Sequence, residues 1–275
     1  MVPFIAGVVD WFVRILSAAV IAAAAVPFVP TGCWFVRVFD FPRLQFGVAG
    51  IALIGLVLVA LPQPEASAWA VGLVLASIWQ LTHVATFTPL VRTEVPASTA
   101  AHTRMVTANL DIRNQKRAET SETLCALDAD ILLLVETDDA WMGPLDDLRR
   151  TYPHRIEHIA PEGLGMVLWS RLELSEGEGR FLVSDARVSI AANLHFQTGS
   201  LLRVRGVHPT PPALSKEHGE SERTSNPDGR HDSRIRDAEL VLIAKEVAED
   251  GDTPWVVTGD FNDVAWSRTT RLFKR

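Results

Sequence analysis

The residues best suited to chemistry in this chain stand where short apolar segments stop. Four such segments, each as long as a typical β-strand, are followed at once by carboxylate, amide or imidazole side chains. A rigid sheet holds the side chains at the ends of its strands in place, which a catalytic or binding site requires. The residues in these positions are Asn109, Glu136, His208, and Asp260 with Asn262.

The segment 255–262 carries the strongest of these signals. Its apolar run begins at Trp255 and ends at Gly259, a residue type that lets the chain turn sharply. Side chains alternate along an extended chain, so Asp260 and Asn262 are expected to point the same way. A carboxylate and an amide that converge at the end of a sheet bind a hard cation, or a phosphate group beside that cation.

Each of these residues, taken singly, also has an ordinary structural interpretation. Asn109 after a strand is typical of a turn. Glu136 precedes Thr137 and two aspartates, any of which would cap a following helix. His208 before a proline is compatible with a loop, and segment 260–262 is compatible with a simple turn. The functional interpretation depends on all four positions occurring in one chain, in this order.

The elements that hold these residues alternate at first between strand and helix. The continuous apolar run at 131–135 indicates a strand buried on both faces. Residues 215–229 are polar and charged and indicate a loop. Mixed strands with helices outside predict an α+β fold of two packed sheets flanked by helices. Strands are predicted at 105–110, 131–135, 165–171, 188–196, 201–207 and 255–259, and helices at 116–127, 138–150 and 234–249.

Residues 1–95 have a composition typical of a membrane region. Their few charged residues leave three uncharged, apolar runs, and about 20 apolar residues are enough to cross a bilayer. We expect three transmembrane helices, at about 12–30, 45–62 and 66–88, and a linker at 96–103. Two other interpretations are a cleaved signal peptide for the first run and a buried helical core. The first run lacks a basic start, however, and two further runs follow it.

The charge of the chain is unevenly distributed. Acidic and basic residues cancel in 1–103, so the net charge of −7 belongs to residues 104–275. Non-specific binding to duplex nucleic acid relies on Lys and Arg, and this balance does not favour it. Cys33 and Cys125 are far apart and form no metal-binding spacing, so structural zinc is not predicted.

Residues 104–275 resemble the endonuclease/exonuclease/phosphatase superfamily, the group that includes pancreatic deoxyribonuclease. The resemblance is strongest to bacterial members with N-terminal membrane spans, and implies a multi-pass protein of the bacterial inner membrane. Counting Lys and Arg near the span ends gives only a weak cytoplasmic bias for the domain, so its side stays open. The matching residues are Thr107-Ala108-Asn109, Leu134-Val135-Glu136, Gly165 to Arg171, His208-Pro209, Arg236 and Gly259-Asp260-Phe261-Asn262.

The resemblance implies a four-layer α/β/β/α sandwich that hydrolyses a phosphodiester or phosphomonoester through water activated by Mg²⁺, with Mn²⁺ as an alternative ion. Glu136, Asn109 and Asp260 would bind the metal. His208, Asp260 and Asn262 would be catalytic, and Asn262 and Arg236 would bind phosphate. For Arg236 the alternative is a plain surface charge. These roles agree with phosphoryl transfer, where metal and donors offset charge that accumulates on oxygen.

One feature departs from the family pattern. Family members close with a Ser-Asp-His type motif whose histidine is the general base, and nothing after Asn262 matches it. We therefore expect an incomplete sandwich, a fragment whose C-terminal part is missing and whose activity is weak or absent. The expected partners are a phosphate-ester substrate (nucleic acid, phospholipid or small molecule) and the lipid bilayer, with no obligate protein partner. The alternative function is a non-catalytic, membrane-bound module that binds a ligand or partner on the same fold.

Overall fold

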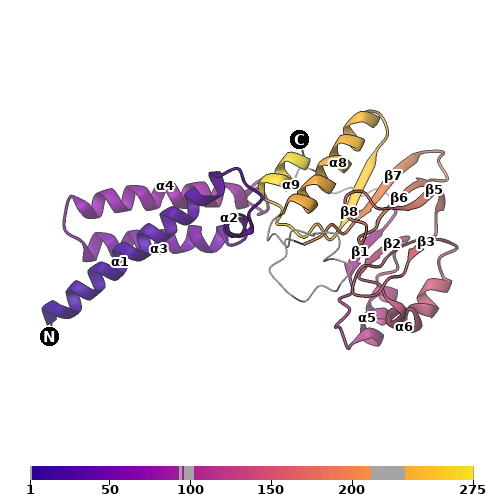
Figure 1. Cartoon of the computed structure of the whole chain (residues 1–275), viewed down its shortest axis with the longest axis horizontal. Coiled ribbons are helices and arrows are strands. Elements are labelled where there is room, and N and C mark those ends of the chain that lie inside the picture. Colours follow the sequence, from indigo (N-terminus) through magenta and orange to yellow (C-terminus); the bar gives the residue numbers. More distant parts are fainter. Residues whose placement is uncertain (1, 93–94, 96–101, 212–232, 275) are drawn as a thin grey trace. The chain divides into compact units, whose positions relative to one another are not determined.

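The computed structural model describes residues 2–92, 95, 102–211 and 233–274. It divides into a helical unit, Met1–Ser98 with Val264–Arg268, and a sandwich unit, Thr99–Asp263 with Thr269–Arg275. Figure 1 shows the long helices of the first unit in indigo and purple, and the sheets of the second in magenta to yellow. The loop predicted at 215–229 lies outside the described residues.

Within its described residues, the helical unit contains three helices long and apolar enough to cross a membrane, as the sequence predicts. Their side chains are apolar outside as well as inside, since Val59 is 90% exposed whereas Val57 and Leu73 are fully buried. The first helix begins at Val2, earlier than the expected start near residue 12, and includes the charged residues Asp10 and Arg14. The long helices are α1 (Val2–Ala25), α3 (Arg43–Ala60) and α4 (Glu65–Ala85), with short helices η1 (Val26–Phe28), α2 (Trp34–Arg37) and η2 (Val38–Asp40).

The part of the sandwich unit that the structure describes forms two four-stranded sheets. The first has the order β1-β2-β4-β3, with β1 parallel to β2 and the remaining pairs antiparallel. The second has the order β5-β6-β7-β8, with β7 parallel to β8. The strands are β1 (Met105–Asn109), β2 (Ile131–Val135), β3 (His154–His158), β4 (Met166–Ser170), β5 (Glu173–Arg180), β6 (Ser189–His195), β7 (Leu201–Val207) and β8 (Trp255–Gly259).

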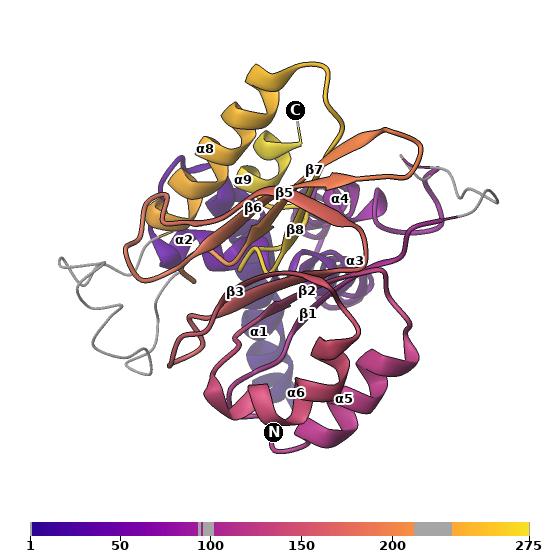
Figure 2. The same cartoon turned by 90° about the vertical axis from the view of Figure 1, so that its right-hand side faces the viewer.

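Helices cover the outer faces of these sheets. Figure 2 shows α5 (Arg117–Ala126) and α6 (Asp139–Arg150) beside the first sheet and α8 (Arg234–Asp250) beside the second. A short helix, α9 (Arg268–Phe273), follows β8. The chain thus has the predicted α+β class, with two packed sheets between layers of helices.

Strand β2 shows how the sequence pattern produces the layers. Its alternate residues Leu132 and Leu134 pack with Trp141 of α6 in one core cluster. Ile131 and Leu133 point the other way, into the cluster between the two sheets. The run of five apolar residues is therefore buried on both faces, as predicted.

Two strands were not predicted from the sequence. Strand β3 pairs with β4 only, and its residues alternate too weakly to give a strand signal. Strand β5 is polar and mostly exposed, and a register shift between Ser175 and Glu178 interrupts its pairing. Both strands lie at the edge of their sheet, where burial does not require an apolar sequence.

Candidate active site

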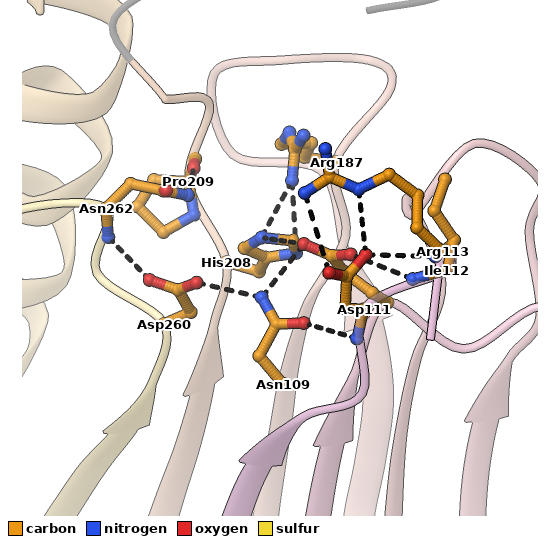
Figure 3. Close-up of polar contacts among 10 residues, drawn as sticks. Asn109, Asp111, Ile112, Arg113, Arg187, His208, Pro209, Asp260 and Asn262 are labelled. Carbon is orange, nitrogen blue, oxygen red and sulfur yellow. Dashed lines mark hydrogen bonds and ion pairs between the residues drawn. The ribbon is translucent and has the colours of Figure 1, made fainter. Parts of the chain in front are cut away.

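Two parallel strand pairs bring the predicted residues together. Strands β1 and β2 of the first sheet end at Asn109 and just before Glu136, while β7 and β8 of the second end just before His208 and Asp260. The hydroxyl oxygens of Thr107 on β1 and Thr258 on β8 are 2.7 Å apart, so the two sheets meet along these strands. Figure 3 shows the strand-end side chains gathered at this edge.

The side-chain amide of Asn109 is the centre of the arrangement. Its Nδ2 donates to Oε1 of Glu136 at 2.8 Å and to Oδ2 of Asp260 at 2.9 Å. Its Oδ1 accepts the backbone N–H of Asp111 at 2.9 Å, which fixes the orientation of the amide. One residue thus joins a carboxylate of the first sheet to a carboxylate of the second, and both carboxylates are only partly buried.

The turn after β8 depends on Gly259. Its φ is +141°, and a Cβ there would lie 1.9 Å from the carbonyl oxygen of Val207, so only glycine fits. Next to it, the N–H of Asp260 donates to that same Val207 carbonyl at 3.1 Å. Asn262 has a left-handed φ of +50°, which asparagine tolerates better than most residues. Its backbone N–H donates to Oδ1 of Asp260 at 2.9 Å, closing the turn.

The side chain of Asn262 connects this turn to the end of β7. Its Nδ2 donates to the carbonyl oxygen of Pro209 at 2.9 Å. Pro209 directly follows His208, so Asn262 ties the segment that carries the histidine to the segment that carries Asp260. Asn262 therefore lies in the site, and its side-chain N–H group already donates to the backbone carbonyl of Pro209.

Glu136 adopts a strained backbone conformation. Its φ is +61°, in a region that costs a non-glycine residue on the order of 1 kcal/mol and persists where the surroundings impose it. Its Oε2 accepts the N–H of Ile112 at 3.3 Å, and Oε1 accepts from Asn109. Gly163 also lies against this carboxylate. Strain of this kind at the end of a buried strand is typical of a functional position.

His208 is buried beside Arg187, a residue that the sequence pattern does not single out. Nη1 of Arg187 lies 3.0 Å from both ring nitrogens of His208, and both side chains are almost fully buried. Nε2 of His208 lies 3.9 Å from Oε1 of Glu136. Arg187 comes from the segment before β6, where a single arginine among irregular residues gives no sequence signal.

Arg236 is placed differently from its expected phosphate-binding role. Its guanidinium is 1% exposed and donates to the carbonyl oxygen of Asn262 at 2.8 Å. It also pairs with Oδ2 of Asp263 at 3.2 Å and Oδ1 of Asp237 at 2.9 Å. Arg236 is therefore buried and paired, and the alternative of a plain surface charge is wrong. Its contacts with Asn262 and Asp263 hold the turn that carries Asp260 and Asn262.

A cavity of about 360 Å³ opens beside Glu136. Two arginines and three carboxylates line it, so its wall offers both donors and acceptors. This cavity is large enough for a small phosphate ester, and it gives such a ligand access to the Glu136 carboxylate. Its lining residues are Asp111, Ile112, Arg113, Glu136, Glu162, Gly163 and Arg187.

The donor set suits a hard cation that keeps most of its water. Among the residues that the structure describes, no group of three His, Cys, Asp or Glu side chains converges on one point. Glu136 and Asp260 nevertheless approach the same amide, and Mg²⁺ is commonly bound through one or two carboxylates with waters and phosphate oxygens. To bind the ion beside them through its oxygen, the Asn109 amide would have to turn over from the orientation that its bond to Asp111 fixes here.

Comparison with known protein families agrees with a site of this chemistry. The family model described as the Endonuclease/Exonuclease/phosphatase family matches residues 106–275. The chain therefore belongs to that family, whose members are generally phosphoesterases or nucleases and typically use divalent metals. No curated protein sequence matches the chain.

Several solved structures are similar to the chain at low sequence identity. A humanized TDP2 of D. rerio is 17% identical, with a TM-score of 0.46, 61% of this chain covered and 66% of that one. A family protein from Bacteroides thetaiotaomicron is 15% identical, with a TM-score of 0.45 and coverage of 62% and 67%. The human Nocturnin catalytic domain is 17% identical, with a TM-score of 0.39 and coverage of 57% and 61%. The chain covers 66%, 62% and 64% of three TDP2 structures, under two thirds of their length.

Proposed function

We propose that this protein is a membrane-anchored phosphoesterase that depends on Mg²⁺ or Mn²⁺. The observation that carries the proposal is the Asn109 amide, which holds Glu136 and Asp260 together although the two carboxylates come from different sheets. Glu136, Asp260 and Asn109 would hold the ion. A bound divalent ion would supply an activated water and offset charge on the phosphate oxygens.

Side chains of the protein would bind the phosphate and orient the attacking water. Arg187 and His208 carry N–H donors beside Glu136, where they would bind the oxygens of a phosphate and stabilise the charge that accumulates there. Asp260 would orient the attacking water. Asn262 fixes the segments of His208 and Asp260 relative to each other through its bond to Pro209, and we propose that the rest of its amide faces the phosphate.

The experiment uses the full chain in detergent micelles with bis(4-nitrophenyl) phosphate as substrate. We expect hydrolysis that requires Mg²⁺ or Mn²⁺, stops with a chelator and falls at least about 100-fold in Glu136→Gln, beyond the usual cost of losing an outer-shell partner of a metal. Glu119→Gln, an exposed carboxylate of α5, is the control and should keep full activity. Turnover retained in Glu136→Gln would overturn the assignment.

A metal titration separates the enzyme from a non-catalytic binding module. An enzyme of this kind should be stabilised by Mn²⁺ in a thermal unfolding experiment, because ligand that binds only the folded state raises its stability. Glu136→Gln should lose that shift. A protein that shows neither a metal-dependent shift nor hydrolysis would instead support a module that binds a ligand or partner without catalysis.

We further propose that residues 1–95 anchor the protein as three membrane spans, residues 96–103 form a linker and residues 104–275 form the catalytic domain. The length and apolar character of three N-terminal helices support this division. The expected location is the inner membrane of a bacterial cell. Resistance of the protein to alkaline carbonate extraction tests the anchoring, and protease accessibility in sealed vesicles decides the side of the domain. Nucleic acid, phospholipid and small phosphate esters all stay within the proposed substrate class.

A further inference from the structure

A second cavity lies between helix α8 and the outer face of the second sheet. Its volume is about 380 Å³, which is within the range of small-molecule sites. Residues of β5, β6 and β7 line it, together with Trp255 at the start of β8 and Glu246 of α8. Its described lining residues do not include any residue of the candidate active site, so the proposed function does not account for this cavity.

The strand register determines which side chains meet in this cavity. Arg203 of β7 is paired with Trp255 of β8, and Arg205 of β7 is paired with Ala191 of β6. Val204, between the two arginines, packs into the core between the sheets, so both arginines point to the outer face. Alanine fills little space, and the position beside Arg205 is therefore a recess in the sheet surface.

Each carboxylate that lines the cavity already accepts a hydrogen bond from the protein. Oε1 of Glu246 accepts from Nη1 of Arg180 at 3.0 Å and also from Nη2 of Arg205. Glu178 accepts from Nε of Arg180, and Oε2 of Glu176 accepts from a side-chain amide of β6 at 2.8 Å. A cationic ligand would have to compete with these bonds, so the cavity does not favour one.

The guanidinium groups, by contrast, retain donors that lack an acceptor. Arg205 is 1% exposed, and its Nε and Nη1 have no hydrogen-bond partner within the described part of the chain. The same holds there for Nε of Arg203. The ring of Trp255, whose centre is 5.4 Å from Cζ of Arg203 and 6.0 Å from Cζ of Arg205, adds cation–π contacts but no acceptor oxygen. Burial accordingly lowers the pKa of Arg205, although the charge of Glu246 opposes this shift.

We propose that this cavity binds a small polyanion, whose phosphate or carboxylate oxygens accept hydrogen bonds from Arg205 and Arg203. Such a ligand supplies the acceptors that the cavity wall lacks, and hydrogen bonds between ionised groups are the strong ones. Glu246 lies about 15 Å along α8 from Arg236, at about 1.5 Å per residue. The polyanion site is therefore separate from the turn that Arg236 holds, and it does not depend on the proposed phosphoesterase function.

The experiment titrates the full chain in detergent by isothermal titration calorimetry, in buffer freed of divalent ions. Pyrophosphate is the probe for phosphate oxygens, and citrate is the probe for carboxylate oxygens. We expect at least one of them to bind, and its affinity to fall at least about tenfold in Arg205→Met, which removes charge-assisted hydrogen bonds. Ala191→Leu fills the recess without changing a charge, and it should weaken the same anion.

The matched control is Arg150→Met, which removes one arginine charge from the exposed surface of α6 and should leave the affinity unchanged. Glu136→Gln should also bind the anion as the wild type does, which separates this site from the proposed metal site. If Arg205→Met does not fold, Ala191→Leu decides alone. Wild-type protein that binds neither anion, or an affinity that Ala191→Leu and Arg205→Met leave unchanged, would overturn the inference without affecting the proposed function.

Discussion

Thr107 and Thr258 share a hydrogen bond of 2.7 Å between their hydroxyl groups, although 151 residues separate them along the chain. They belong to β1 and β8, in different sheets. Side chains alternate along a strand, so the residues two positions later, Asn109 and Asp260, emerge on the same side and form the next contact, at 2.9 Å. The threonine pair therefore aligns the strands that form the site.

This alignment predicts the behaviour of valine substitutions. Thr258→Val keeps the side chain's shape but leaves the Thr107 hydroxyl without this partner, which costs about 1–2 kcal/mol of unfolding free energy. The double variant Thr107→Val/Thr258→Val should lose less than the sum of the two single variants, because no unmatched hydroxyl remains. Chemical denaturation of the four proteins measures this coupling. Strictly additive losses would show that the two hydroxyls do not depend on each other.

Gly259 supplies a second prediction. An alanine there would place its Cβ 1.9 Å from the Val207 carbonyl oxygen, so the turn that presents Asp260 must shift. We expect Gly259→Ala to cost more than about 3 kcal/mol, at the upper end for single substitutions, and to abolish the stabilisation by Mn²⁺. Gly199→Ala is the control, since Gly199 has a φ of +81° with open space around it and should cost only about 1 kcal/mol. Equal losses in the two variants would contradict the steric argument.

The strand ends of the site could be predicted because each follows an apolar run. A carboxylate, amide or imidazole directly after such a run stands out, and the structure brings Asn109, Glu136, His208 and Asp260 to one edge. The α+β class follows from the same pattern of strands and helices. The distance between the two sheets could not be predicted from the sequence. Side-chain contacts such as the Thr107–Thr258 hydrogen bond determine that distance.

The supporting residues could not be predicted for a different reason. The helix predicted at 234–249 is present as α8, and its apolar residues Leu240 and Ile243 are fully buried. Hydrophobic periodicity assigns charged residues to the solvent side, whereas Arg236 and Glu239 lie buried on α8 as well. Arg187 lies before β6 in a segment without periodicity. Buried charged residues of this kind can be recognised only when the residues that pack around them are known.

The placement of Arg236 leads to a third prediction. Its guanidinium and the Asp263 carboxylate are each 1% exposed and form an ion pair of 3.2 Å. Arg236→Met removes one partner of a buried pair, which costs about 3–5 kcal/mol of unfolding free energy. Arg236→Lys keeps the charge but not the forked geometry, and should cost less.

Phosphate affinity then distinguishes the two roles of Arg236. If Arg236 only holds the turn, Arg236→Lys should bind inorganic phosphate within about twofold of the wild type when both are folded, a difference of under 1 kcal/mol. Arg187→Lys, measured in parallel by calorimetry, should bind it far more weakly. A large loss confined to Arg236→Lys would restore the phosphate-binding role expected from the sequence.

The pKa of Glu239 gives the last prediction, a dependence of stability on pH. Burial raises this pKa from 4.5 to about 7, so the folded state favours the protonated carboxyl. The free energy of unfolding that this shift contributes is complete below pH 4.5. About 3 kcal/mol of it is lost as the pH rises through 7. Glu239→Gln should therefore match the wild type near pH 4.5 and become the more stable protein by pH 8.

Glu157→Gln should show the opposite trend, because Arg149 lowers the pKa of Glu157 and the ionised form stabilises the fold at neutral pH. Unfolding temperatures measured from pH 4.5 to 8 test both, and parallel curves for Glu239→Gln and the wild type would refute the burial of an unpartnered carboxylate.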